Sequence, residues 1–168
     1  MKIVNSTNAD IETIFELYNH GTEHQKKVAK KHWKGFQRSL IEQEISEKRQ
    51  WKIVIDNEVA CVFAIDYNDP DIWGDKDNDP SIYIHRIATN PVFRGRFLVK
   101  QIVEWAKVHA REIQKTFIRM DTGSGNEKLN NYYVSCGFTY LGVIKLTNSD
   151  SLPAHYKDGD FSLFEIRL

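Results

Sequence analysis

The amino-acid sequence predicts an α/β (α+β) protein with a single mixed, mostly antiparallel sheet and helices on both faces. The chain has 168 residues, 41% of them hydrophobic, which is enough to build one core in a single domain over 1–168. Short apolar runs of strand length alternate with segments whose apolar residues recur at helical spacing. The resulting order is β-α-α-β-β-β-α-β-α-β-β, without an internal repeat or a linker.

The N-terminal part is predicted to contain one strand and two helical segments. Residues 2–5 have the pattern of a short strand. Thr7 and Asp10 are spaced like a capping box, so the first helix begins there, and Gly21 is expected to end it. Residues 22–49 continue as further helix, with an apolar stripe beside a charged face.

A hairpin and an acidic loop follow. The segments 51–55 and 59–65 are apolar and flank an Asp-Asn turn, which is typical of paired antiparallel strands. Residues 66–80 carry six aspartates and are predicted to form an exposed loop that draws a cationic amine toward the sheet. Their spacing is similar to that of a calcium loop, but Pro80 stands where that motif needs glycine.

The second half alternates strands and helices. A strand over 82–89 precedes an amphipathic helix over about 97–113, and a strand over 116–121 precedes a short helix that Gly137 is expected to cap. The last two strands are predicted at 138–146 and 161–168. Their connection, 147–160, is long enough to suggest a functional loop.

The turn before the long helix has the chemistry of an anion site. Arg94-Gly95-Arg96 leads into a helix that starts near Phe97. The first N–H groups of a helix have no partner within it, and the helix dipole adds positive potential. With two arginines beside them, these groups suit a pyrophosphate. From these residues alone, a plain strand-to-helix turn with solvated arginines remains an equal alternative.

Residues 81–138 resemble the acetyl-CoA-binding half of the GCN5-related N-acetyltransferases. The signature of that family, R/Q-x-x-G-x-G/A, aligns with Arg94-Gly95-Arg96-Phe97-Leu98-Val99, where Phe97 and Val99 replace two glycines. We expect Phe97 to keep its N–H available, because helical φ is open to any residue, and Phe97→Gly to lower stability. The resemblance implies that acetyl-CoA is contacted by Ile87, Ala88, Thr89, Arg94, Gly95, Arg96, Phe97, Leu98, Val99, Lys100 and Asn126.

The same resemblance implies a cleft in the middle of the sheet. Two neighbouring parallel strands would splay apart there and leave backbone groups unpaired. The segment from His85 to Pro91 is similar to the family's strand that leads into the anion turn. The backbone groups of Ile87 and Thr89 would then pair with the pantetheine arm of the cofactor.

The short helix resembles the family's motif N-x-x-A-x-x-(L/F)-Y-x-x-x-G-F, beginning at Asn126 and reaching Tyr133 and Gly137. The resemblance implies that Asn126 binds the pantetheine arm and that Tyr133 protonates the departing thiolate. A phenol with a pKa near 10 is able to do so at neutral pH. The alternative for Tyr133 is an ordinary core aromatic, and its neighbour Tyr132 is expected to face another direction.

Three residues are candidates for the acceptor side. His85, on the strand before the cleft, is a candidate general base, with a packed and hydrogen-bonded histidine as the alternative. Asp121 ends the next strand, where it would orient substrate or cap a turn. Trp33 lies in the early helical region, where the family builds part of its acceptor pocket, although most tryptophans are packing residues.

Composition limits the other classes of partner. The chain has 23 basic and 23 acidic residues, so its formal net charge is zero and no global field attracts nucleic acid or a membrane. The basic stretch 26–34 is read as a solvated helix face. Cys61 and Cys136 have no metal-type spacing and suit free thiols in a reducing cytoplasm. The His20/His24 pair lacks a third ligand, so no metal is expected.

These observations favour a cytoplasmic enzyme that moves an acetyl group from acetyl-CoA to a primary amine of a small molecule or peptide. The attack would be direct, because the sequence offers no cysteine or serine nucleophile with an adjacent base. The protein would act as a monomer or homodimer. The alternative is a non-catalytic CoA-binding sensor, which the replacement of both glycines by Phe97 and Val99 supports.

Overall fold

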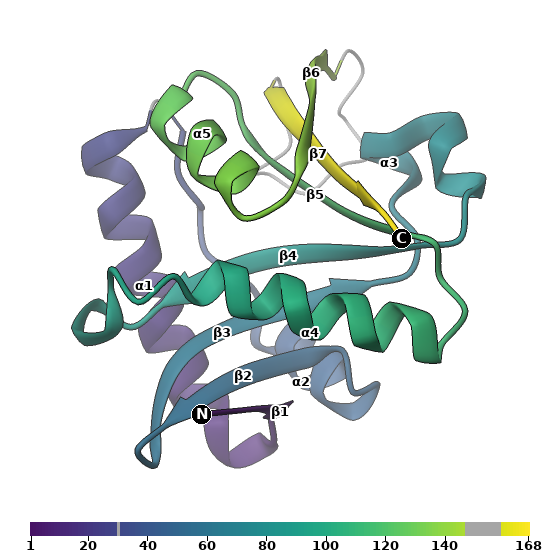
Figure 1. The fold of residues 1–168 in the computed structure, drawn as a ribbon. Helices are drawn as coiled ribbons and strands as arrows, with labels where there is room; N and C mark the ends of the chain where they lie inside the picture. Colours follow the sequence, from purple (N-terminus) through teal and green to yellow (C-terminus); the bar gives the residue numbers. More distant parts are fainter. Residues whose placement is uncertain (30, 147–158) are drawn as a thin grey trace.

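A computed structural model describes residues 1–29, 31–146 and 159–168. All described strands join one seven-stranded sheet in the order β1-β2-β3-β4-β5-β7-β6 (Figure 1). The elements are β1 (Lys2–Asn5), η1 (Asn8–Asp10), α1 (Ile11–Val28), α2 (Arg38–Ser46), β2 (Gln50–Ile55), β3 (Glu58–Asp66), α3 (Pro70–Trp73), η2 (Gly74–Asn78), β4 (Ser81–Thr89), η3 (Pro91–Phe93), α4 (Leu98–Glu112), β5 (Phe117–Gly123), α5 (Glu127–Ser135), β6 (Thr139–Lys145) and β7 (Asp160–Arg167). Among the described strands, only β4 and β5 pair in parallel. The predicted fold class is therefore confirmed.

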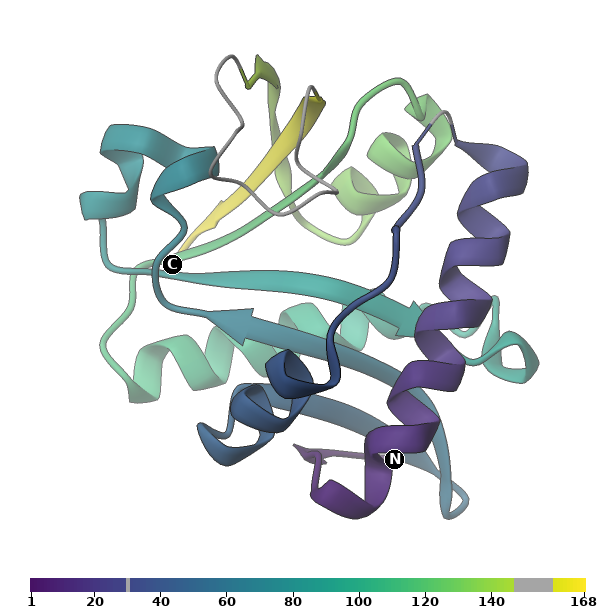
Figure 2. The ribbon, with the colours of Figure 1, turned by 180° about the vertical axis from the view of Figure 1, so that it is seen from behind.

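Helices cover both faces of the sheet. α1 and α2 lie on one face, and α4 and α5 lie on the other (Figures 1 and 2). On the first face, Ile14 and Leu17 of α1 pack against Val62 and Ala88. On the second, α4 buries an apolar stripe over the centre of the sheet, formed by Leu98, Val99, Ile102, Val103, Ala106 and Ala110.

Gly21 does not end the first helix, as the sequence analysis expected. α1 continues through it to Val28. A Cβ atom at this position would lie 2.8 Å from Cζ3 of Trp33, so a larger residue would collide with the indole ring. Gly21 therefore serves the close approach of Trp33, which outweighs the cost of about 1 kcal/mol for a glycine within a helix.

Two further element predictions need correction. Residues 22–49 do not form continuous helix, because 31–37 are irregular and α2 begins only at Arg38. The acidic segment 66–80 is not a plain loop, because it contains α3 and η2. The connection 147–160, predicted to be functional, lies outside the described residues apart from its last two positions.

A bulge interrupts β4 at its centre. Val62 of β3 pairs with Ala88 and Ala64 pairs with His85, so Phe63 alone stands opposite both Arg86 and Ile87. Arg86 has φ +51°, in the left-handed region that non-glycine residues rarely adopt. Such a bulge bends a strand and increases its twist.

Past the start of β4, the central strands separate. The β4–β5 pairing covers only Ser81↔Phe117, Ile82↔Ile118 and Tyr83↔Arg119, although both strands continue for several residues beyond it. The splayed strand pair that the family resemblance implied is therefore present. It leaves the β5-facing edge of β4 without a strand partner from Ile84 onward.

The turn after β4 differs from expectation at one residue. α4 begins at Leu98, within one residue of the predicted start, but its N-cap Phe97 has φ +54° and ψ +39°. The assumption of a helical φ at Phe97 is therefore wrong. The Phe97 side chain is 63% exposed, so little packing compensates for the strained backbone.

We expect Phe97→Gly to stabilise the protein, which reverses the expectation drawn from the sequence. Glycine adopts this φ without the steric cost of a Cβ atom, so Phe97→Gly should be about 1 kcal/mol more stable than Phe97→Ala. Urea denaturation of the two variants measures this difference. A glycine variant less stable than the alanine variant would contradict the left-handed assignment.

Candidate active site

The splay between β4 and β5 opens onto a cavity of about 730 Å³. One end is lined by the turn after β4 and by α5, and includes Arg94, Asn126 and Tyr133. The other end is lined by the acidic segment after β3 and includes Asp69 and Asp121. His85 lies at the acidic end beside these two residues, and the bulge of β4 lies between the two ends. The cavity therefore joins a basic end to an acidic end across the free edge of β4.

Six of the eleven residues expected to contact acetyl-CoA line this cavity, namely Ile87, Ala88, Thr89, Arg94, Val99 and Asn126. The others lie on the turn and at the start of α4. Leu98 packs in the core, so only its backbone faces a ligand at the helix N-terminus. Arg96 lies over the ring of Phe93, with its Cζ atom 5.0 Å from the ring centroid. Gly95, Phe97 and Lys100 are exposed.

Asn126 has a structural function as well as a place in the cavity. It is the N-cap of α5, and its side-chain oxygen accepts a hydrogen bond from the Leu129 N–H at 3.1 Å. The predicted cap at the other end is confirmed, because Gly137 follows the helix with φ +109°. These two residues fix the ends of the helix that carries Tyr133.

Tyr133 lies on the inner face of α5 and is only 9% exposed. Its ring packs edge-on against Phe164, with 5.2 Å between centroids. Burial raises the pKa of this phenol well above its usual value, so it stays protonated at neutral pH. Tyr132 lines the same cavity, contrary to the expectation that it faces elsewhere, and burial raises its pKa to about 12.

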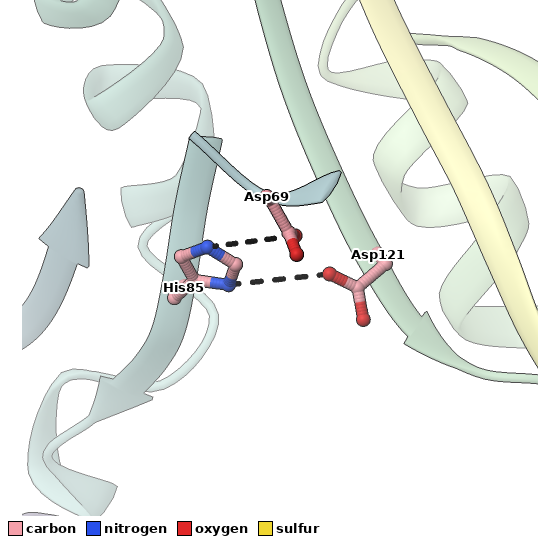
Figure 3. A group of neighbouring side chains, drawn as sticks. All are labelled: Asp69, His85 and Asp121. Carbon is pink, nitrogen blue, oxygen red and sulfur yellow. Dashed lines mark ion pairs between the residues drawn. The ribbon is translucent and has the colours of Figure 1, made fainter. Parts of the chain in front are cut away.

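At the acidic end, His85 lies between two carboxylates. Its Nε2 atom is 3.9 Å from Oδ2 of Asp69, and its Nδ1 atom is 3.9 Å from Oδ1 of Asp121 (Figure 3). Oδ2 of Asp66 lies 3.8 Å from the same Nε2. The structure thus brings together His85 and Asp121, the two acceptor-side candidates of the sheet.

Sequence reasoning missed Asp69. It belongs to the segment expected to be an exposed acidic loop, but its side chain is only 13% exposed. Its backbone N–H donates to the Asp77 carboxylate at 2.7 Å. The buried Arg119 holds the same segment through the Asp79 carboxylate at 2.7 Å and the Lys76 carbonyl. No spacing in the sequence distinguishes Asp69 from the other five aspartates.

The three carboxyl groups around His85 bind protons more tightly than usual. Burial raises the pKa of Asp69 to about 8, with Asp121 and Asp66 adding repulsion. Burial raises the pKa of Asp121 to about 7 and that of Asp66 to about 6. The cause is the cost of an ionised carboxylate away from water. A cation placed among these carboxyl groups would offset their repulsion and favour their ionised forms.

The nearby arginines are engaged by other acids. Arg86 donates to the buried Glu44 carboxylate, and Arg49 donates to Asp66. Oδ2 of Asp69 and Oδ1 of Asp121 are buried and have no hydrogen-bond partner among the described residues. The acidic end thus presents two carboxylate oxygens that protein donors do not satisfy.

Asp69, His85 and Asp121 also have the residue types of a metal site. One ligand atom from each lies within 4.8 Å of the others. The sequence analysis expected no metal, and this cluster is the place where one would bind in the described part of the chain.

Trp33 lines the cavity from the segment between α1 and α2. Its ring packs on Tyr18 and Phe36, with centroid separations of 5.6 and 5.5 Å. Trp33 therefore packs in an aromatic cluster and also lines the cavity. Cys61 and Cys136 are buried free thiols, as expected.

Comparison with known proteins identifies the fold. A model of the acetyltransferase (GNAT) family matches residues 11–138. The uncharacterized N-acetyltransferase YesJ of Bacillus subtilis is 32% identical over 75 residues, which are 45% of this chain and 42% of that protein. An uncharacterized N-acetyltransferase of Lactobacillus delbrueckii subsp. lactis is 33% identical over 86 residues, 51% and 48% of the two chains. The match thus spans less than half the length of each curated relative.

Solved structures match over nearly the whole chain. A GNAT-family acetyltransferase of Listeria monocytogenes superposes with a TM-score of 0.77 at 26% identity. The match covers 99% of this chain and 94% of the Listeria chain. An acetyltransferase of Salmonella typhimurium, solved with its cofactor acetyl-CoA, has a TM-score of 0.71 at 15% identity and covers 100% and 94%. In the part of the chain described here, no helix is long and apolar enough to cross a membrane.

The raised pKa of Asp121 predicts how stability depends on pH. A carboxyl with a raised pKa in the folded state stabilises the fold below its ordinary pKa, 3.8, and loses this contribution as pH rises through about 7. Each pKa unit corresponds to about 1.4 kcal/mol. Asp121→Asn should therefore lose less stability than the wild type between pH 5 and pH 8 in urea denaturation.

The exposed Asp75→Asn, in η2, is the matched control and should keep the wild-type pH dependence. Identical pH slopes for the wild type and Asp121→Asn would show that Asp121 ionises normally in the folded protein.

Proposed function

Because the chain belongs to the acetyltransferase (GNAT) family, we propose that it transfers an acetyl group from acetyl-CoA to a primary amine by direct attack. The observation that carries this proposal is the position of two proton-transfer groups on one cavity. Tyr133 lies on the α5 wall, and His85 lies on β4 directly before the bulge. An acyl group held against the free edge of β4 would lie between them.

The cofactor would bind along the basic end of the cavity. Its pyrophosphate would accept hydrogen bonds from the N-terminus of the 15-residue helix α4 and from Arg94. Its pantetheine amides would pair with the backbone of Ile87 and Thr89, which β5 leaves free. Asn126, at the start of α5, would complete this wall.

The chemistry then needs two proton transfers. The amine nitrogen attacks the thioester carbonyl carbon, and the C–S bond breaks as the C–N bond forms. The nitrogen gives up a proton to His85, and the departing CoA thiolate takes the Tyr133 proton. Asp69 and Asp121 would stabilise the imidazolium that forms on His85, because each carboxylate faces one ring nitrogen.

The positive φ of Phe97 removes the support that this glycine replacement gave to the sensor alternative. The left-handed conformation at this position is one that glycine adopts easily, so the turn keeps a glycine-type backbone although the glycine is replaced. The exposed Phe97 ring is outside the cavity lining. The replacement therefore leaves room for a cofactor.

Arg94→Ala should weaken acetyl-CoA binding by about 1–3 kcal/mol, the range for hydrogen bonds to a charged group. Isothermal titration calorimetry with acetyl-CoA measures it. Arg111→Ala, an arginine near the C-terminal end of α4, is the matched control and should leave the affinity unchanged. An equal effect of both substitutions would argue against a pyrophosphate at the turn.

Tyr133→Phe should lower kcat by roughly 10²–10⁴, because it removes the proton donor and keeps the ring. Acetyl-CoA affinity should change little. The assay is thiol release from acetyl-CoA with a panel of primary amines. Tyr132→Phe is the control on the same helix, and we expect a small effect. Equal small effects of both substitutions would remove Tyr133 from the mechanism.

A further inference from the structure

Two buried carboxylate oxygens at the acidic end of the cavity receive no hydrogen bond from the described part of the chain. Asp121 exposes only 6% of its side chain, and neither its Oδ1 atom nor Oδ2 of Asp69 has a hydrogen-bond partner among the described residues. Buried polar atoms are nearly always satisfied, because an unmet hydrogen bond costs free energy. Both residues line the cavity, so a bound ligand is the natural source of the missing donors.

The spacing of these oxygens suits one ammonium group. One carboxylate oxygen of Asp69 and one of Asp121 lie within 4.8 Å of each other. An ammonium nitrogen that donates to both at about 2.8 Å, with a roughly tetrahedral angle, spans this separation. We infer that Asp69 and Asp121 together bind the primary ammonium group of the acceptor, and that the acceptor is an alkylamine without a carboxylate next to the nitrogen. This inference rests on the proposed function.

The three carboxylates at the acidic end repel an adjacent carboxylate. Asp66 also lies at this end, and the arginines beside it are engaged by Asp66 and Glu44. An α-amino acid bound through its ammonium group would bring its own carboxylate against Asp69 and Asp121, which repel it. An amide in that place carries no charge, so peptide N-termini remain acceptable.

A metal ion fits this geometry less well. The two ring nitrogens of His85 face different carboxylates, Nε2 toward Asp69 and Nδ1 toward Asp121 (Figure 3). One ion binds only one of these nitrogens, and metal–oxygen bonds of about 2.0–2.2 Å require the two carboxylates to come closer together. An ammonium group binds the oxygens where they are. It releases one proton to solvent to become the nucleophilic amine, and His85 takes the second as the C–N bond forms.

The test compares amines that differ only in the α-carboxylate. The pairs are isoamylamine and leucine, tyramine and tyrosine, and agmatine and arginine, and leucinamide serves as the uncharged analogue of leucine. We expect kcat/KM for at least one amine to exceed that of its parent amino acid by tenfold or more. Leucinamide should resemble isoamylamine, which separates the effect of charge from that of bulk.

Variants connect the preference to the two carboxylates. Asp69→Asn and Asp121→Asn should each raise KM for the amine about tenfold to a hundredfold. Both should reduce the difference in kcat/KM between each amine and its parent amino acid, and both should leave the affinity for acetyl-CoA unchanged. Asp75→Asn, an exposed aspartate in η2, should keep the wild-type KM within about twofold.

The outcomes separate this inference from the proposed function. Transfer to leucine as efficient as to isoamylamine, or amine KM values unaffected by both variants, would overturn the inference while acetyl transfer stands. If no amine is acetylated, calorimetry on the CoA-loaded protein decides. Isoamylamine binding that Asp121→Asn abolishes supports the ammonium site, and the absence of binding overturns it. Tight binding of ZnCl₂ that prevents amine binding would identify a metal site instead.

Discussion

The buried ion pair between Glu44 and Arg86 is the interaction on which the cleft depends. Arg86 occupies the bulge of β4 with a strained φ of +51°, a conformation that costs of order 1–3 kcal/mol and persists only where its surroundings fix it. Glu44 of α2 is 1% exposed and accepts a hydrogen bond from the Arg86 guanidinium. Removal of one partner of such a pair leaves a buried charge, at a cost of about 3–5 kcal/mol. The pair therefore fastens the bulge to a helix on the opposite face of the sheet from α4.

This bulge determines where the reactive groups lie. It bends β4 three residues past Tyr83, the last residue that pairs with β5, so the strands stay apart and His85 lines the cavity between them. Tyr133 enters the same cavity from α5, whose ends are fixed by Asn126 and Gly137. Asp69 comes from a third element, which Arg119 attaches to the sheet. Three elements thus supply one site, and each is held by its own polar contact.

The sequence predicted the order of strands and helices because burial on a sheet imposes a period of two and burial of a helix face imposes a period near 3.6. Such patterns do not report contacts between distant segments. Gly21 was wrongly predicted to end a helix, because only the fold brings Trp33 against it. The φ of Phe97 depends on the turn that joins β4 to α4, and helical periodicity carries no information about it. Asp69 was predicted to be one of six solvated aspartates, because its burial arises from the packing of α3 and η2 beside the sheet.

A crystal structure of the protein with acetyl-CoA tests the central claim most directly, namely that the splay opened by the bulge is the acyl-transfer cleft. The account predicts pantetheine amides hydrogen-bonded to the backbone of Ile87 and Thr89, with the thioester sulfur within about 3.5 Å of the Tyr133 hydroxyl. A cofactor bound elsewhere, or β4 and β5 paired along their full length in the complex, would contradict it.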